Sequence, residues 1–226
     1  SRPTIAARVA RLAGELADTG FVPGRPVRES LPEGAVYLNI GQIGLAVPPF
    51  HRWLDHRTDV AAIHMLHDVI PLEHPGLVEP ASRSHHLRMV KTTARHADGL
   101  VVTTAHAAER VGAELVRHRA APIETLVRPL PLPRAFAVRR SADPAVSAAG
   151  YFLVCGSVEP RKNHALLFEV WRRLHARLGA AAPRLVIVGA LGWRGDELLR
   201  PLAEPALAGR IAHVCGLSTP ALARLM

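Results

Sequence analysis

The chain has 226 residues, of which 49% are hydrophobic and 21% charged. These proportions are typical of a globular protein that buries one or two cores, and they exclude disordered, collagen-like and coiled-coil chains. The longest apolar run, residues 185–193, is about half the roughly 18 residues that a membrane-spanning helix needs. Residues 1–17 lack the apolar core of a secretory signal, so we expect a cytoplasmic protein whose natural start precedes Ser1.

The net charge of +9 comes from 28 lysine and arginine residues against 19 acidic ones. Such a balance can mark a nucleic-acid binder. Here the only lysines are Lys91 and Lys162, and the arginines are spread along the chain. We interpret the charge as a compositional bias toward arginine and expect no nucleic-acid partner. The two cysteines, Cys155 and Cys215, are predicted to be buried free thiols.

Short apolar runs alternate with longer amphipathic stretches in the first part of the chain, which is typical of βαβ units and a parallel sheet. Strands are expected at 35–40, 59–66, 99–104 and 122–127, and helices at 49–55, 81–96 and 105–117. A glycine-rich turn is expected after the first strand and a proline-rich loop before the second helix.

Alternating prolines then mark a change of composition, and residues 134–149 have the character of a linker. The linker separates an N-terminal domain, residues 1–133, from a C-terminal domain, residues 150–226. In the second domain, strands are expected at 151–155, 184–188 and 210–215, and helices at 164–178, 196–203 and 218–226. No stop signal ends the last helix, so we expect the natural chain to continue beyond it.

The expected fold class is α/β, with two Rossmann-like, doubly wound parallel-sheet domains, both incomplete. Such folds bind ligands at the carboxyl ends of their strands. The segment 156–163 follows a strand there, and Gly156 lets the backbone approach a ligand closely. Arg161 and Lys162 suit a pyrophosphate, and Asn163 suits a helix N-cap. Because cations at a helix N-terminus oppose the helix dipole, they favour an anionic ligand.

His67 follows the strand predicted at 59–66, with Asp68 beside it to orient the ring. Its place at a strand end makes it a candidate catalytic residue. His64, three residues earlier, is expected to project to the opposite face of the strand. His85 and His86 diverge on a helix in the same way. We therefore predict no metal site.

Residues 151–164, Tyr-Phe-Leu-Val-Cys-Gly-Ser-Val-Glu-Pro-Arg-Lys-Asn-His, resemble the start of the donor domain in family 4 glycosyltransferases of the GT-B fold. Residues 185–189 and 213–217 resemble the next two strands of that domain, and residues 67–71 resemble the acceptor-side histidine motif. The resemblance implies a metal-independent enzyme without a cofactor. Such an enzyme moves a sugar from a nucleotide-diphosphate donor to a glycan or lipid-linked acceptor and retains the anomeric configuration.

The family pattern also implies roles for single residues. Arg161 and Lys162, with Gly156, would hold the donor diphosphate, and His67 would face the reacting sugar. Three positions would lie near the donor sugar or base: Glu159, Gly189 and Leu217. The loop at Gly41 and Gln42 would approach the same cleft. The paired glutamates of the family fall beyond Met226 in the pattern, so this chain by itself is expected to be inactive.

Two other functions remain open at this point: a nucleotide-sugar epimerase of similar build, and a non-catalytic module that binds sugar nucleotides or presents a basic surface. GDP-mannose is the first expectation for the donor. A peripheral association with the inner membrane face is the further partner that we expect.

Overall fold

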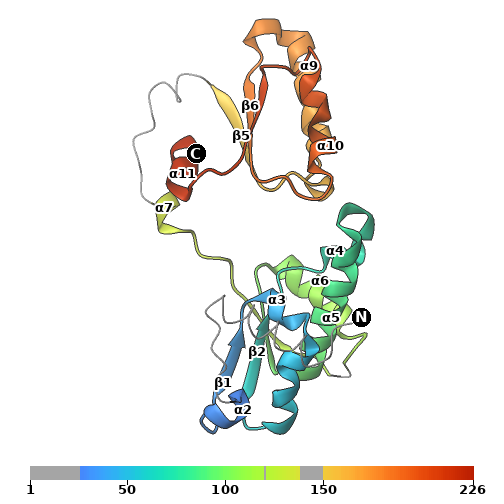
Figure 1. The fold of residues 1–226 in the computed structure, drawn as a ribbon, viewed down its shortest axis with the longest axis vertical. Coiled ribbons are helices and arrows are strands. Elements are labelled where there is room, and N and C mark those ends of the chain that lie inside the picture. Colours follow the sequence, from blue (N-terminus) through green and yellow to red (C-terminus); the bar gives the residue numbers. More distant parts are fainter. Residues whose placement is uncertain (1–25, 120, 138–149) are drawn as a thin grey trace, which may run out of the picture.

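The computed structural model describes residues 26–119, 121–137 and 150–226, and two parallel sheets organise them (Figure 1). The first sheet has four strands in the order β1-β2-β3-β4 and the second has three in the order β5-β6-β7. The strands are β1 (Val36–Asn39), β2 (Ala61–Met65), β3 (Gly99–Val102), β4 (Glu124–Val127), β5 (Tyr151–Cys155), β6 (Arg184–Val188) and β7 (Ile211–Val214). Every predicted strand is therefore present, and the α/β class with incomplete Rossmann-like domains is confirmed.

The first unit, which is the four-stranded sheet with the helices that pack on it, contains α2 (Val27–Ser30), α3 (Gln42–Leu45), α4 (Ile70–Glu73), α5 (Pro80–His96) and α6 (Ala105–Leu115). Two 3-10 helices accompany them, η1 (Pro48–His56) and η2 (Pro75–Leu77). The short helix α7 (Arg134–Ala137) lies apart from this sheet, beside α11 (Thr219–Leu225) (Figure 1). None of the helices in the described ranges is long and apolar enough to cross a membrane. The linker predicted at 134–149 begins with α7, and its remaining residues lie outside the described part of the chain, as do residues 1–25. The predicted domain boundary stays a prediction.

Two local predictions for the first unit need correction. The helix expected at 49–55 is present, but it is the 3-10 helix η1. Phe50 N donates to Val47 O at 2.9 Å, the short spacing of a 3-10 turn. The glycine-rich turn and the proline-rich loop also contain short helices, α3 and α4, which lie at the carboxyl ends of β1 and β2.

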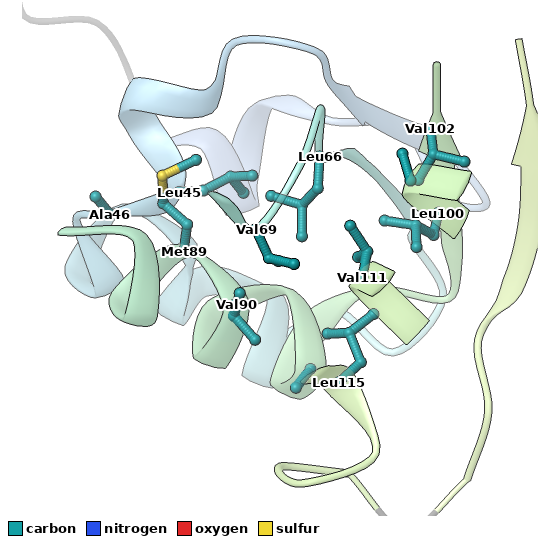
Figure 2. Close-up of a cluster of buried hydrophobic side chains, with 12 residues drawn as sticks. Leu45, Ala46, Leu66, Val69, Met89, Val90, Leu100, Val102, Val111 and Leu115 are labelled. Carbon is teal, nitrogen blue, oxygen red and sulfur yellow. The ribbon is translucent and has the colours of Figure 1, made fainter. Parts of the chain in front are cut away.

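One face of the first sheet carries the core. Figure 2 shows Leu100 and Val102 of β3 directed toward α5 and α6, whose inner faces contribute Val90 and Val111. On the opposite face, β1 exposes Val36 and Leu38, and Ile40, which follows the strand, is exposed as well. The strand order never reverses, and right-handed crossovers then place successive helices on the same side. The described residues therefore cover this sheet on one face.

The second unit is built in the same way around α9 (His164–Leu178), whose Phe168 and Trp171 pack on Leu185 and Ile187 of β6. Trp171 Nε1 donates to Pro183 O at 2.8 Å, so the tryptophan belongs to the core, as predicted. The other helices are α10 (Gly195–Leu199) and α11 (Thr219–Leu225), with the 3-10 helices η3 (Pro160–Lys162), η4 (Gly179–Ala181) and η5 (Arg200–Ala203). The helix predicted at 196–203 thus becomes 3-10 in its second half.

The prediction that the cysteines are buried is wrong. Cys155 and Cys215 are free thiols, but both are exposed. Cys155 ends β5 and Cys215 follows β7, and these are the two edge strands of the second sheet. Their apolar sequence context indicated burial, but a position at a strand end on a sheet edge has fewer neighbours to cover it.

The core arrangement predicts unequal costs for two leucine truncations in the first sheet. Leu100 is 1% exposed, so Leu100→Ala should lower the free energy of unfolding by about 2–5 kcal/mol through lost burial and a cavity. Leu38, on the uncovered face, is 56% exposed, and Leu38→Ala should change stability by less than about 1 kcal/mol. Urea unfolding of both variants measures the difference; equal losses would contradict the assignment of the buried face.

Three histidine rings, from η1, β2 and α5, pack together in the first unit. The ring centroids of His51 and His64 lie 5.5 Å apart, and His96 stacks on His51 at 6.3 Å. Burial lowers the pKa of His64 to about 3, with the neighbouring histidines acting in the same direction. Burial also lowers the pKa of His51 and of His96, although Asp55 opposes the shift at His96.

The cluster predicts that acid destabilises the protein. The folded-state pKa values lie below the unfolded value of about 6.5, so the unfolded state binds more protons in between. Stability should be full above about pH 6.5 and fall as pH drops toward 3, by up to about 1.4 kcal/mol per pH unit for His64. Urea unfolding at pH 7.5 and pH 5 measures this slope. His64→Leu should flatten it, whereas His74→Leu, at an exposed position, should leave it unchanged.

Candidate functional site

The loop between β5 and α9 turns sharply at Gly156. Gly156 has φ +150°, a conformation that residues with a side chain rarely adopt, and its N–H donates to Val188 O at 2.9 Å. The loop then forms η3, and Lys162 folds back over the glycine, where a Cβ would lie 3.7 Å from Lys162 Cε. The structure therefore places the two predicted diphosphate residues Gly156 and Lys162 side by side.

Asn163 begins α9 in a different way from the one predicted. Its backbone is left-handed, with φ 51° and ψ 46°, and its side chain makes no capping hydrogen bond. Its carbonyl oxygen instead accepts from Leu166 N at 3.1 Å. The N–H groups at the start of α9 therefore have no cap from the Asn163 side chain.

Arg161 is held by an acidic neighbour. Its Nη2 donates to Glu159 Oε1 at 2.8 Å, and Ser157 Oγ donates to the same carboxylate. Burial alone would raise the pKa of Glu159, but the hydrogen bonds from Ser157 and Arg161 and the nearby charges of Arg161 and Lys162 lower it below its ordinary value. Glu159 is therefore an ionised anchor for Arg161.

Lys162 differs from Arg161 in its charge environment. Among the residues that the structure describes, Lys162 takes part in no ion pair. It follows Arg161 on η3 and lies two residues before His164, the first residue of α9. An ammonium group that forms no ion pair within the described structure, near N–H groups of a helix start without a side-chain cap, favours a bound anion.

His67 lies between β2 and α4, where the chain leaves the first sheet. Asp68 Oδ1 accepts from Ile70 N at 3.0 Å, and Asp68 O is 3.0 Å from His86 Nε2. Asp68 therefore fixes the loop and links it to α5. The described hydrogen bonds include none between Asp68 and the ring of His67, so the prediction that Asp68 orients this ring is wrong.

Two adjoining cavities bring these segments together, and each is lined by both units. The first has a volume of about 580 Å³ and is lined by Asp68, Arg88, Glu159, Arg161 and Trp193, among others. The second has a volume of about 460 Å³ and is lined by His67, Asp68, His106, Arg161 and Lys162, among others. The structure thus unites His67 with Arg161 and Lys162, although these residues lie in different units of the chain.

The remaining predicted residues lie elsewhere. Gly189 lies against the backbone of Gly156, because a Cβ on Gly189 would overlap the carbonyl oxygen of Gly156. Gly41 and Gln42 are at the start of α3, and Leu217 follows β7; none of the three lines either cavity. The buried Nε2 of Gln42 has no hydrogen-bond partner within the described structure.

The cavities also contain residues that were not expected from the sequence, among them His106 and Trp193. His106 lies in the first turn of α6, on the segment that follows β3, so its place in the chain was a usable signal. Trp193 lies in the glycine-rich segment that follows β6. The described residues contain no group of three or more His, Cys, Asp or Glu side chains placed to hold a metal ion.

Comparison with known proteins identifies the fold. The chain is 29% identical over 188 residues to the serotype-specific mannosyltransferase WbdA of Escherichia coli, covering 73% of this chain and 22% of WbdA. The crystal structure of Anabaena HepE in complex with UDP and glucose matches with a TM-score of 0.58 and 16% identity, covering 99% of this chain and 57% of HepE. The fold is GT-B.

A second GT-B structure agrees. The pneumococcal O-GlcNAc transferase GtfA, in complex with UDP and GlcNAc, matches with a TM-score of 0.54 and 12% identity, covering 94% of this chain and 37% of GtfA. No family model matches the chain. The chain spans about a fifth of the length of the curated relatives that it matches. The resemblance to GT-B glycosyltransferases inferred from the sequence is confirmed at the level of the fold.

The charge environment of Lys162 predicts a measurable role in anion binding. Lys162→Ala should weaken the binding of GDP or UDP about 10- to 100-fold, because a hydrogen bond to a charged group contributes about 1.5–3 kcal/mol. Lys91 is the matched control: it is the one other lysine, it is exposed on α5 and it lines neither cavity. Titration calorimetry with both nucleotides measures the affinities. Equal affinities for Lys162→Ala and Lys91→Ala would refute the role.

Proposed function

We propose that this chain forms the substrate cleft of a glycosyltransferase that moves a sugar from a nucleotide-diphosphate donor to an acceptor hydroxyl. The observation that carries the proposal is the second cavity, in which His67 of one unit meets Arg161 and Lys162 of the other. The likeness to the mannosyltransferase WbdA and the GT-B fold support the same reaction class. Both cavities lie within the size range of small-molecule sites.

The diphosphate is the proposed leaving group, and the charges of the second cavity suit it. The bond between C1 of the donor sugar and the diphosphate oxygen breaks, and its electron pair stays on the diphosphate. Lys162, Arg161 and the N–H groups at the start of α9 then stabilise the charge that develops. Because the groups are fixed before the reaction, this stabilisation needs little rearrangement.

The acceptor oxygen forms the new bond to C1 in the proposed reaction. For retention of configuration, the acceptor attacks from the face that the diphosphate leaves, and its proton passes to the departing phosphate oxygen. His67 would contact the sugar at this point, since it lines the cavity that holds Lys162. Retention and independence of metal ions are proposals that rest on the resemblance in sequence to family 4 enzymes.

The proposal also covers the class of the donor and of the acceptor. The likeness to WbdA, a mannosyltransferase, supports mannose, whereas HepE and GtfA were solved with UDP, so both GDP-mannose and UDP-sugars should be assayed. A glycan or lipid-linked acceptor remains the proposal for the second substrate. Cytoplasmic location and contact with the inner membrane face also remain predictions.

A histidine substitution tests the reaction in the full-length protein. His67→Ala should lower kcat for transfer about 100-fold, because a hydrogen bond made in the transition state is lost, while donor affinity stays within about twofold. His56→Ala is the control, since His56 is exposed at the end of η1 and lines neither cavity. Chromatography of the products measures transfer. Conversion of the donor without an acceptor would indicate an epimerase, and an unchanged kcat for His67→Ala would contradict the role of this residue.

A further inference from the structure

Trp193 projects from a rigid support on the donor side of the first cavity. Its segment is locked to the loop after β5 by Val158 N donating to Ala190 O at 2.9 Å and Gly192 N donating to Val158 O at 3.0 Å. A Cβ on Gly192 would lie 3.3 Å from Glu159 Cβ, so the two loops pack as closely as backbone allows. The backbone that precedes Trp193 is therefore held against the loop of Glu159, and Trp193 and Glu159 line the same cavity.

The Trp193 ring is half-buried and lies near a charged neighbour. The guanidinium carbon of Arg194 lies 5.7 Å from the ring centroid, and Arg194 is itself tied to Glu197 at 2.8 Å. Trp193 is not a member of the buried core of the second unit, unlike Trp171. A large aromatic side chain that lines a cavity outside the core offers apolar surface to a ligand.

The opposite wall of the first cavity consists of hydrogen-bonding groups from α5. His85 and Arg88 both line it. Arg88 Nε donates to Ala46 O at 3.1 Å, which fixes the side chain while its terminal amino groups keep their donors. Among the described residues Arg88 has no acidic partner, and α5 contains no Asp or Glu. The terminal N–H groups of the Arg88 guanidinium therefore remain available as hydrogen-bond donors on this wall.

The two cavities differ in the chemistry that they favour. The second contains His67 and Lys162 and suits a diphosphate, whereas the first contains neither and combines an indole with planar hydrogen-bonding groups. A pyranose ring has the matching surface, with an apolar face of C–H groups and hydroxyl groups around its edge. The cavities share Asp68, Ile70 and Arg161, so ligands in the two would meet there.

We infer that the first cavity is the subsite for the acceptor sugar, where Trp193 stacks on a pyranose ring and His85 and Arg88 bind its hydroxyl groups. This inference rests on the proposed transferase function and adds a residue that determines acceptor specificity. The donor sugar remains attached to the diphosphate in the second cavity. The acceptor hydroxyl then reaches C1 at the shared boundary.

The test uses the full-length protein saturated with GDP or UDP, and methyl α-D-mannopyranoside as the acceptor probe. Saturation-transfer NMR titration should show that Trp193→Ala weakens glycoside binding roughly tenfold, since the stacked apolar area is lost. Trp193→Phe, which keeps an aromatic ring, should retain most of the affinity. Phe50→Ala is the matched control, because Phe50 is an exposed aromatic residue outside both cavities. Calorimetry should show unchanged nucleotide binding in all three variants.

Three outcomes would overturn the inference. Equal glycoside binding by Trp193→Ala and the unmodified protein would remove Trp193 from the subsite. A parallel loss of nucleotide binding in Trp193→Ala would assign the residue to the donor site or to folding. Nucleotide binding by the unmodified protein without any glycoside binding would also count against the inference, whereas a failure to bind nucleotide at all would refute the proposed function itself.

Discussion

The candidate site depends on a backbone contact between two loops of the second unit. Gly189, at the end of β6, lies so close to Gly156 that a Cβ would overlap the carbonyl oxygen of Gly156. An isolated bridge between Val158 and Leu191 continues this contact along the chain. The two loops therefore behave as a single support, and the side chains that line both cavities from the donor side project from it. A side chain at Gly189 would overlap the backbone of Gly156 and approach Ser157 N, so this position requires glycine.

The cationic side chains of the chain differ in whether an acidic side chain pairs with them. Nine of the arginines that the structure describes form an ion pair with an acidic side chain, as Arg161 does with Glu159. Lys162 has none there, and it lies where the dipole of α9 also favours an anion. The overall charge of +9 therefore does not identify a ligand. The position of the Lys162 ammonium group near N–H groups without a side-chain cap indicates an anionic ligand. Exposed ion pairs elsewhere contribute little to stability or to binding.

The sequence predicted the strands well, because buried parallel strands are short apolar runs bounded by turns. Its errors fall where local context is ambiguous. The helix expected at 49–55 is the 3-10 helix η1, and Asn163 adopted a left-handed backbone in place of a side-chain cap. Cys155 was expected inside because its neighbours in the chain are apolar, yet its place on an edge strand exposes it. The buried histidine cluster gave no periodic signal, since its members come from three separate elements.

The amino-acid sequence by itself determined the α/β class, the order of the strands along the chain and the candidate anion-binding segment around Lys162. These follow from patterns that extend over a few neighbouring residues. The tertiary structure decided which candidates meet: His67 shares a cavity with Lys162, while Leu217 and Gln42 line neither cavity. It also brought Trp193 opposite α5. Which residues share a cavity depends on how the two sheets and their loops pack. No local sequence pattern encodes this packing, because the contacts join residues that are distant in the chain.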